Sequence, residues 1–152
     1  ATLVRMEPDS WSSVLRTNLD SAYNVTRPVV AGMVERGFGR IVNISSVNGQ
    51  RGQFGQANYS AAKAGLHGFT MAVAREVARK GVTVNTVSPG YIQSPLIMAV
   101  PEKVREGIRG QIPVGRFGDP SEIARAVLFL VAEDAGYITG SDLSVNGGYH
   151  MG

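Results

Sequence analysis

The sequence predicts an α/β protein in which helices cover both faces of a parallel sheet, the doubly wound arrangement. Two short runs rich in β-branched residues, 40–45 and 81–87, are typical of strands, and the first is typical of a strand buried on both faces. A long segment with apolar residues at helical spacing separates them, and another helical segment precedes a last short strand at 142–145. Strands that alternate with helices need crossover connections, which place the strands parallel in one sheet.

The first predicted helix begins at Pro8, where proline suits the first helical position and acidic neighbours suit the helix dipole. Apolar residues then recur at helical spacing as far as Met33. Pro28 lies inside this pattern, so we expect the helix to kink or break near Arg27. Gly37 ends the segment before the first strand.

The elements after the first strand are bounded by glycine, proline or polar residues, which favour turns and helix ends. They are a polar, glycine-rich loop at 48–56, a helix at 58–79 closed by Gly81, the second strand ended by Ser88, Pro89 and Gly90, an irregular stretch at 91–117 with a short helix at 102–108, and a helix at 120–132. With neither repeats nor a linker, residues 1–152 are expected to belong to a single domain.

Composition excludes several classes of protein. The formal charge of +3 comes without any Lys/Arg-rich block, which argues against nucleic-acid binding. The chain has no cysteine, and His67 and His150 lack metal-ligand spacing, so we expect no metal site. No apolar run is long enough to cross a membrane. These features predict a cytoplasmic protein without nucleic-acid, metal or membrane partners.

Polar residues converge at the carboxyl ends of the predicted strands. Ser46 follows the first strand, and a Ser-Pro-Gly turn follows the second. Tyr59 and Lys63 stand one helical turn apart at the start of the intervening helix. Because parallel strands gather their ligands at this edge of the sheet, we expect the three side chains to form one site.

A tyrosine and a lysine spaced in this way have a specific chemical use. A free tyrosine has a pKa near 10, and a lysine one turn away favours its phenolate. Such a tyrosine can give a proton to a carbonyl oxygen while Ser46 holds that oxygen by a hydrogen bond. Reduction of a carbonyl also needs an electron pair, which points to a nicotinamide cofactor.

Taken together, these residues resemble the short-chain dehydrogenases/reductases. The resemblance runs from about Met6 to Gly152 and implies a Rossmann-type sheet. It rests on NISS at 43–46, Tyr-x-x-x-Lys at 59–63, VNTVSPG at 84–90 and Asn18 within VLRTNL at 14–19. Pro28 and Pro95 depart from the patterns of the family.

The resemblance implies a role for each site residue. Tyr59 would be the general acid/base, and Ser46 would orient the substrate carbonyl. Lys63 would lower the pKa of the tyrosine and hold the nicotinamide ribose, while Asn18 would carry a water that links Lys63 to solvent. The cofactor would also rest on Pro89, Gly90, Ile92 and Ser94, the last of which stands where many members have threonine.

The loop at 47–59 and the end of the chain resemble those of acetoacetyl-CoA reductases, the NADPH enzymes of polyhydroxybutyrate synthesis. This implies an acyl-CoA substrate, reduced to 3-hydroxybutyryl-CoA by a homotetramer. The relatives that reduce 3-oxoacyl chains on acyl carrier protein share the framework and are the alternative. By resemblance, the substrate pocket would contain Ser46, Gln53, Phe54, Gln56, Gly90 and Tyr91.

A nicotinamide enzyme of this fold seats the cofactor pyrophosphate on a glycine-rich turn between a strand and a helix. Residues 1–152 contain no such unit and no residue that chooses between NAD and NADP. We therefore expect the N-terminal cofactor-binding part, roughly the first third of the enzyme, to precede Ala1. On this expectation the chain alone is inactive. A binding or assembly module without activity is the alternative, and the coding sequence upstream of Ala1 would separate the two.

Overall fold

The computed structural model describes residues 1–152 and contains a parallel sheet in the strand order β1-β2-β3. Ile44 of the first strand pairs with Val87 of the second, and Val87 pairs with Leu143 of the third. The strands are β1 (Gly39–Ile44), β2 (Val82–Pro89) and β3 (Asp142–Val145). The predicted α/β class with a parallel sheet is confirmed.

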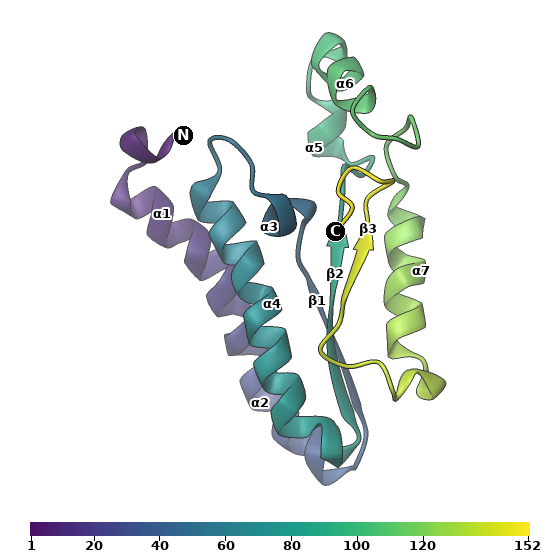
Figure 1. Cartoon of the computed structure of the whole chain (residues 1–152). Helices are drawn as coiled ribbons and strands as arrows, with labels where there is room; N and C mark the ends of the chain where they lie inside the picture. Colours follow the sequence, from purple (N-terminus) through teal and green to yellow (C-terminus); the bar gives the residue numbers. More distant parts are fainter.

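Helices cover both faces of this sheet (Figure 1). α2 and α4 pack on one face and α7 packs on the other, while α1 lies beside α4. The helices are α1 (Pro8–Leu15), α2 (Ser21–Glu35), α3 (Val47–Arg51), α4 (Ala57–Val77), α5 (Pro95–Met98), α6 (Glu102–Arg109) and α7 (Pro120–Val131). Two short helices, α5 and α6, occupy the stretch that was expected to hold one. No helix combines the length and the apolar character needed to cross a membrane.

The first helical segment is not interrupted at Pro28. α1 continues through a π-helical turn, Arg16–Asp20, into α2, and α2 contains Pro28 in its interior. The predicted break of the helix near Arg27 is therefore wrong, because α2 runs through this residue. Pro28 is exposed, so the carbonyl of Asn24, which lacks an amide donor from the proline, can be satisfied by water. The irregularity lies at the π-turn instead.

α4 ends as its sequence predicts. A short 3₁₀ turn, Ala78–Lys80, is followed by Gly81 in the left-handed conformation, with φ 75°. The position also requires glycine for space, because a Cβ added there would lie 2.0 Å from the carbonyl oxygen of Gly37.

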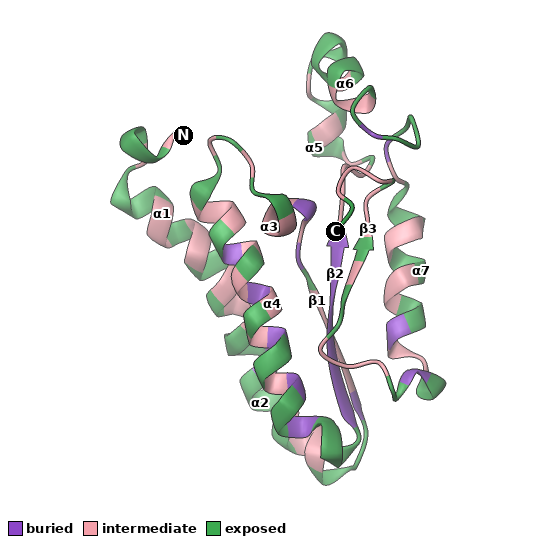
Figure 2. Cartoon of the chain, viewed as in Figure 1, coloured by how far each residue is buried: buried purple, intermediate pink, exposed green.

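β2 is the buried centre of the protein (Figure 2). Its residues from Val82 to Ser88 are all buried, whereas β1 is mostly half-buried and Ile44 is 45% exposed. Burial on both faces, which was predicted for the first strand, is therefore wrong for β1, and it is β2 that is buried. The reason is that β2 is paired along both edges, while β1 pairs with β2 alone.

The apolar core lies between α4, α2 and the sheet. Its buried members are Ala74, Val77, Val82 and Val84, with partly buried side chains of α2, β1 and α4 against them. A polar residue of β2 is also buried, and it is satisfied by the segment before β3. Asn85 donates to the Ile138 carbonyl at 2.8 Å and accepts from the Ser141 amide at 3.1 Å.

Candidate active site

Most of the predicted site residues meet in one pocket at the carboxyl ends of β1 and β2. The pocket has a volume of about 520 Å³. Predicted site residues in its lining are Ser46, Gln56, Tyr59, Gly90, Tyr91, Ile92 and Ser94, and the remaining lining residues are Val47, Asn48, Leu96 and Ile97. The topology thus brings together residues from the segment after β1, from the start of α4 and from the segment after β2.

Ser46 begins α3 as its N-cap residue. Its Oγ accepts a hydrogen bond from the Asn48 amide at 3.1 Å. This cap turns Val47–Arg51 into a short helix, so the expectation of a loop over 48–56 was wrong for its first residues. Because the capping bond uses an acceptor site, the hydroxyl hydrogen of Ser46 stays free for donation.

Tyr59 and Lys63 lie one turn apart in α4, as predicted. The Lys63 Nζ donates to the Ile44 carbonyl at 2.8 Å and lies 5.6 Å from the centroid of the Tyr59 ring. Burial lowers the pKa of Lys63 because desolvation disfavours its charged form. The ammonium group is therefore held between the end of β1 and the tyrosine ring.

Asn18 lies in the π-helical turn and faces a second cavity together with Lys63. This cavity has a volume of about 250 Å³ and is also lined by residues of β1 and α2. The Asn18 side-chain amide donates to the Val14 carbonyl at 3.0 Å. π-Turns are frequent at functional sites, and this one places Asn18 in the same cavity as Lys63.

The opposite wall of the pocket comes from the segment that follows β2. Gly90 lies against the start of the C-terminal turn, where an added Cβ would come within 2.8 Å of the Asn146 Cα. Ile92 forms an isolated β-bridge with Gly118. Ser94 caps α5, where its Oγ accepts from the Ile97 amide at 3.4 Å.

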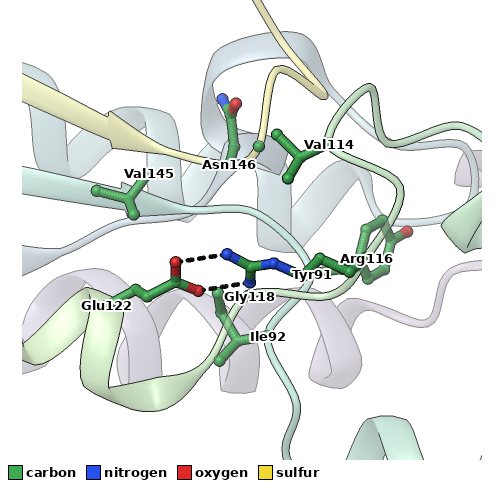
Figure 3. A pocket seen from close by; sticks show the side chains of 9 residues that line it. Tyr91, Ile92, Val114, Arg116, Gly118, Glu122, Val145 and Asn146 are labelled. Atoms are coloured by element: carbon green, nitrogen blue, oxygen red, sulfur yellow. Dashed lines mark hydrogen bonds and ion pairs between the residues drawn. The ribbon is translucent and has the colours of Figure 1, made fainter.

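A smaller cavity of about 110 Å³ lies next to this wall, and Tyr91 and Ile92 line both cavities. Figure 3 shows Arg116 reaching across it to Glu122 at the start of α7. The two side chains form a bidentate pair with both distances at 2.8 Å. Hydrogen bonds from Arg116 and from the Asp119 amide lower the pKa of Glu122 to about 2. The pair links the segment before α7 to the first turn of α7, next to the larger pocket.

Five residues predicted for the site do not line this pocket. Asn18 and Lys63 line the second cavity, and Gln53, Phe54 and Pro89 line neither. Phe54 is 88% exposed, and Gln53 lies in the same turn. Pro89 is the last residue of β2 and precedes the lining residue Gly90. The roles assigned to all the site residues remain predictions.

Sequence reasoning missed a group of residues around Tyr91. The Tyr91 ring meets Tyr149 edge-on with centroids 5.3 Å apart, and the Arg51 guanidinium lies 4.4 Å from the Tyr149 ring centroid. Burial raises the pKa of Tyr91, and the nearby Tyr149 raises it further. A signal for Arg51 was present, since it is the one cation in the loop at 47–56. Among the lining residues, Asn48, Leu96 and Ile97 carried no such signal.

The fold and the Ser46, Tyr59, Lys63 arrangement define a class of protein. The family described as enoyl-(acyl carrier protein) reductase matches residues 1–150. The chain belongs to the short-chain dehydrogenase/reductase family, whose members use NAD(P)H.

Individual relatives carry more specific names. The chain is 59% identical over 150 residues to the acetoacetyl-CoA reductase of Allochromatium vinosum, covering 99% of this chain and 61% of the relative. It is 60% identical over 148 residues to the acetoacetyl-CoA reductase of Cupriavidus necator, covering 97% and 60%. It is 50% identical over 149 residues to the 3-oxoacyl-[acyl-carrier-protein] reductase of Vibrio cholerae, covering 98% and 61%. The chain thus spans about 60% of the length of these curated relatives.

Proposed function

We propose that the whole protein reduces acetoacetyl-CoA to 3-hydroxybutyryl-CoA with NADPH, the reductive step of polyhydroxybutyrate synthesis, and that this chain supplies the catalytic half. The observation that carries the proposal is the meeting of Ser46 and Tyr59 in one pocket, with the Lys63 ammonium 5.6 Å from the Tyr59 ring. The names of the relatives that share 59% and 60% of aligned residues support the choice of substrate.

The residues present fit the nicotinamide end of the cofactor. The lining offers hydroxyl donors from Tyr59 and Ser94, and the Lys63 ammonium stands beside Tyr59, a donor set that suits a ribose diol and a carboxamide. Tyr59, Lys63, Gly90, Ile92 and Ser94, with the preceding Pro89, would hold this part of the molecule. When bound, the reduced nicotinamide supplies the hydride for the substrate carbonyl carbon.

The chain's own side chains account for the proton and the orientation. The free hydroxyl hydrogen of Ser46 donates to the carbonyl oxygen and fixes its place in the pocket. The Tyr59 hydroxyl then gives a proton to the same oxygen as it becomes an alcohol. Lys63 provides a positive charge beside the phenol, and a water in the cavity that it shares with Asn18 returns the proton from solvent.

The substrate would lie between Ser46, Tyr59 and the loop wall formed by Gly90 and Tyr91. The Tyr91 phenol belongs to this wall and would offer a second hydrogen-bond donor to the thioester end. Gln56 lines the same pocket and is held by the Asn48 side-chain amide at 3.0 Å. Gln53 and Phe54 would join the substrate contacts by movement of their turn, since Phe54 is exposed.

The carrier-protein thioester is the second candidate substrate, favoured by the 50% identity to the Vibrio cholerae reductase. A panel of thioesters at fixed NADPH concentration separates the two. We expect kcat/KM to be highest for acetoacetyl-CoA and lower for longer 3-oxoacyl-CoA thioesters and for the carrier-protein thioester. A clear preference for long chains or for the carrier protein contradicts the proposal. Replacement of NADPH by NADH tests whether NADPH is the cofactor.

We also propose a cytoplasmic homotetramer. Exposed apolar side chains on α2 and α4, among them Tyr23, Val25 and Met71, support an interface on this side of the molecule. Light scattering on the purified whole protein measures the assembly, and a monomer in solution contradicts it.

Residues 1–152 expressed alone should neither bind NADPH tightly nor reduce acetoacetyl-CoA. Titration by NADPH fluorescence tests this, and steady turnover by the isolated chain contradicts it.

A further inference from the structure

A polar network beneath the pocket takes no part in the chemistry described above. It centres on His67, one helical turn after Lys63 in α4. The His67 Nε2 lies 2.8 Å from the Ser45 Oγ, 3.4 Å from the Ser88 Oγ and 3.5 Å from the Asp142 Oδ2. Ser45, Ser88 and Asp142 stand on or beside β1, β2 and β3, so one imidazole joins α4 to all three strands.

The hydrogens of this network can be assigned from the partners. The Ser45 hydroxyl donates to the Lys63 carbonyl at 2.9 Å, and the Ser88 hydroxyl donates to the Asp142 Oδ1 at 2.7 Å. Each hydroxyl has a single hydrogen, so neither serine can donate to His67. The single hydrogen on Nε2 is therefore donated mainly to the Ser45 Oγ, the nearer of the two oxygens at 2.8 Å. A lone pair on Nε2 would also face the Asp142 carboxylate. The structure therefore assigns a hydrogen to Nε2 of His67.

Asp142 is the fixed end of the network. Its Oδ2 accepts from the Gln50 side-chain amide at 2.7 Å, and the same amide group reaches the Ser144 Oγ at 2.5 Å. The carboxylate therefore receives hydrogen bonds from α3 and from β2 while it faces the imidazole. Side chains from α3, β2 and α4 thus contact this carboxylate of β3, which fixes the imidazole in turn.

The arrangement is not a nucleophilic triad, although it contains a serine, a histidine and an aspartate. In a triad the carboxylate and the serine bind different ring nitrogens, whereas Ser45 and Asp142 both approach Nε2 of His67. Ser45 is also only 3% exposed, and its hydrogen is committed to a backbone carbonyl. The network therefore connects α4 to the strands, and Ser45 is not a nucleophile.

Three consecutive residues at the end of β1 connect this network to the pocket. Ile44 accepts from the Lys63 ammonium, Ser45 donates to the Lys63 carbonyl, and Ser46 lines the pocket with Tyr59. The bond from Ser45 thus sets the position of one α4 turn relative to the strand end. That position fixes the separation between Ser46 and Tyr59.

We propose that His67 is a positioning residue for carbonyl reduction. Through Ser45 it holds the α4 turn that carries Lys63, and it thereby keeps Tyr59 and Ser46 at their working separation. This inference rests on the proposed reductase function. Small displacements of reacting groups cost large factors in rate, so loss of the network lowers kcat more than it changes KM.

Kinetics of the whole protein test the proposal. His67→Leu and Ser45→Ala should each lower kcat about tenfold, with KM for acetoacetyl-CoA and for NADPH changed less than about twofold. Because both changes break the same connection, the double variant should be no slower than either single one. His67→Gln keeps an N–H donor at similar reach and should retain most activity. His150→Leu, at the other histidine of the chain, is the matched control and should behave as the parent.

The outcomes divide clearly. Parent-like kcat in folded His67→Leu, or an additive loss in the double variant, overturns the proposal. If His67→Leu does not fold, Ser45→Ala removes a single atom from the same connection and gives the same comparison. A purely structural role would lower the melting temperature of these variants without changing kcat per folded molecule, and that result also overturns it.

Two measurements stay informative if the parent reduces no acetoacetyl-CoA, a result that would refute the proposed function by itself. Imidazole ¹H–¹⁵N spectra of the parent should show the Nε2–H tautomer of neutral His67, and the Nδ1–H tautomer contradicts the network. Amide hydrogen exchange over residues 63–68 should be faster in His67→Leu than in His150→Leu, and equal rates contradict the positioning role.

Discussion

The two walls of the pocket are held in different ways. The wall with Ser46 and Tyr59 joins β1 to α4 by hydrogen bonds at both the ammonium and the carbonyl of Lys63. Gly49 of α3 packs so closely on this turn that an added Cβ would lie 2.8 Å from the Lys63 carbonyl carbon. The wall with Tyr91 is a loop outside the regular elements. It is held by a backbone hydrogen bond from Gly90 to Val145, by the β-bridge at Ile92, by the contact between Tyr91 and Tyr149, and by an exposed ion pair.

This difference suggests that the two walls contribute to different steps, one to proton transfer and the other to substrate binding. The proposed proton transfer needs donor and acceptor at a fixed distance, and the wall with Ser46 and Tyr59, here called the catalytic wall, would supply this through contacts between regular elements. A wall formed by a loop outside the regular elements can change its contacts without moving Ser46 and Tyr59. Changes to the first wall should therefore act on kcat, and changes to the second should act on KM.

The largest effect is expected at the catalytic wall itself. Tyr59→Phe removes the proton donor and should lower kcat of the whole protein at least about a hundredfold. NADPH binding, measured by fluorescence titration, should persist because the ring remains. Tyr137→Phe, at a fully exposed tyrosine, is the matched control. Near-normal turnover in Tyr59→Phe would remove this residue from the mechanism.

Gly49→Ala tests how closely the catalytic wall is fixed. The new Cβ meets the backbone of Lys63 and Ala64 at 2.8 Å and 2.9 Å, so α3 and α4 must move apart. We expect kcat to fall about tenfold with little change in KM. Gly107→Ala in α6, where an added Cβ meets nothing within 4 Å, is the control. It should leave kinetics unchanged and stabilise the fold by at most about 1 kcal/mol.

Gly118→Ala makes a comparable change at the loop wall. Its Cβ would come within 2.7 Å of the Ile92 Cδ1, which is the end of a flexible side chain and can turn away. We expect KM for acetoacetyl-CoA to rise about threefold while kcat stays near that of the parent. A loss of kcat as large as that of Gly49→Ala would show that the two walls are equally constrained.

The smallest effect concerns the ion pair at the loop wall. The pKa of Glu122 is lowered from 4.5 to about 2 by hydrogen bonds from Arg116 and the Asp119 amide. A carboxylate with a lowered pKa adds stability that is complete above pH 4.5 and is lost as the pH falls toward 2. Glu122→Gln should therefore narrow the difference in melting temperature between pH 6 and pH 3 by a small amount, because the pair is exposed. An unchanged pH dependence contradicts this assignment.

Local sequence signals predicted much of this protein. The strand at 142–145 agrees residue by residue with β3, and the glycine C-cap at Gly81 was predicted from its position after a basic helix end. The convergence of Ser46, Tyr59 and Lys63 followed from the rule that parallel strands end at one edge. Each of these inferences depends on periodicity, capping or strand direction, which act over a few residues.

Tertiary structure decided the rest. The runs that form β1 and β2 look alike in sequence, and only the number of neighbouring strands made one half-buried and the other buried. His67 looked like an isolated histidine because its partner Asp142 lies far along the chain. Pro28 remained inside α2 because its side of the helix faces solvent. Burial and side-chain partners depend on which distant segments pack together, and that information is absent from any short stretch of the sequence.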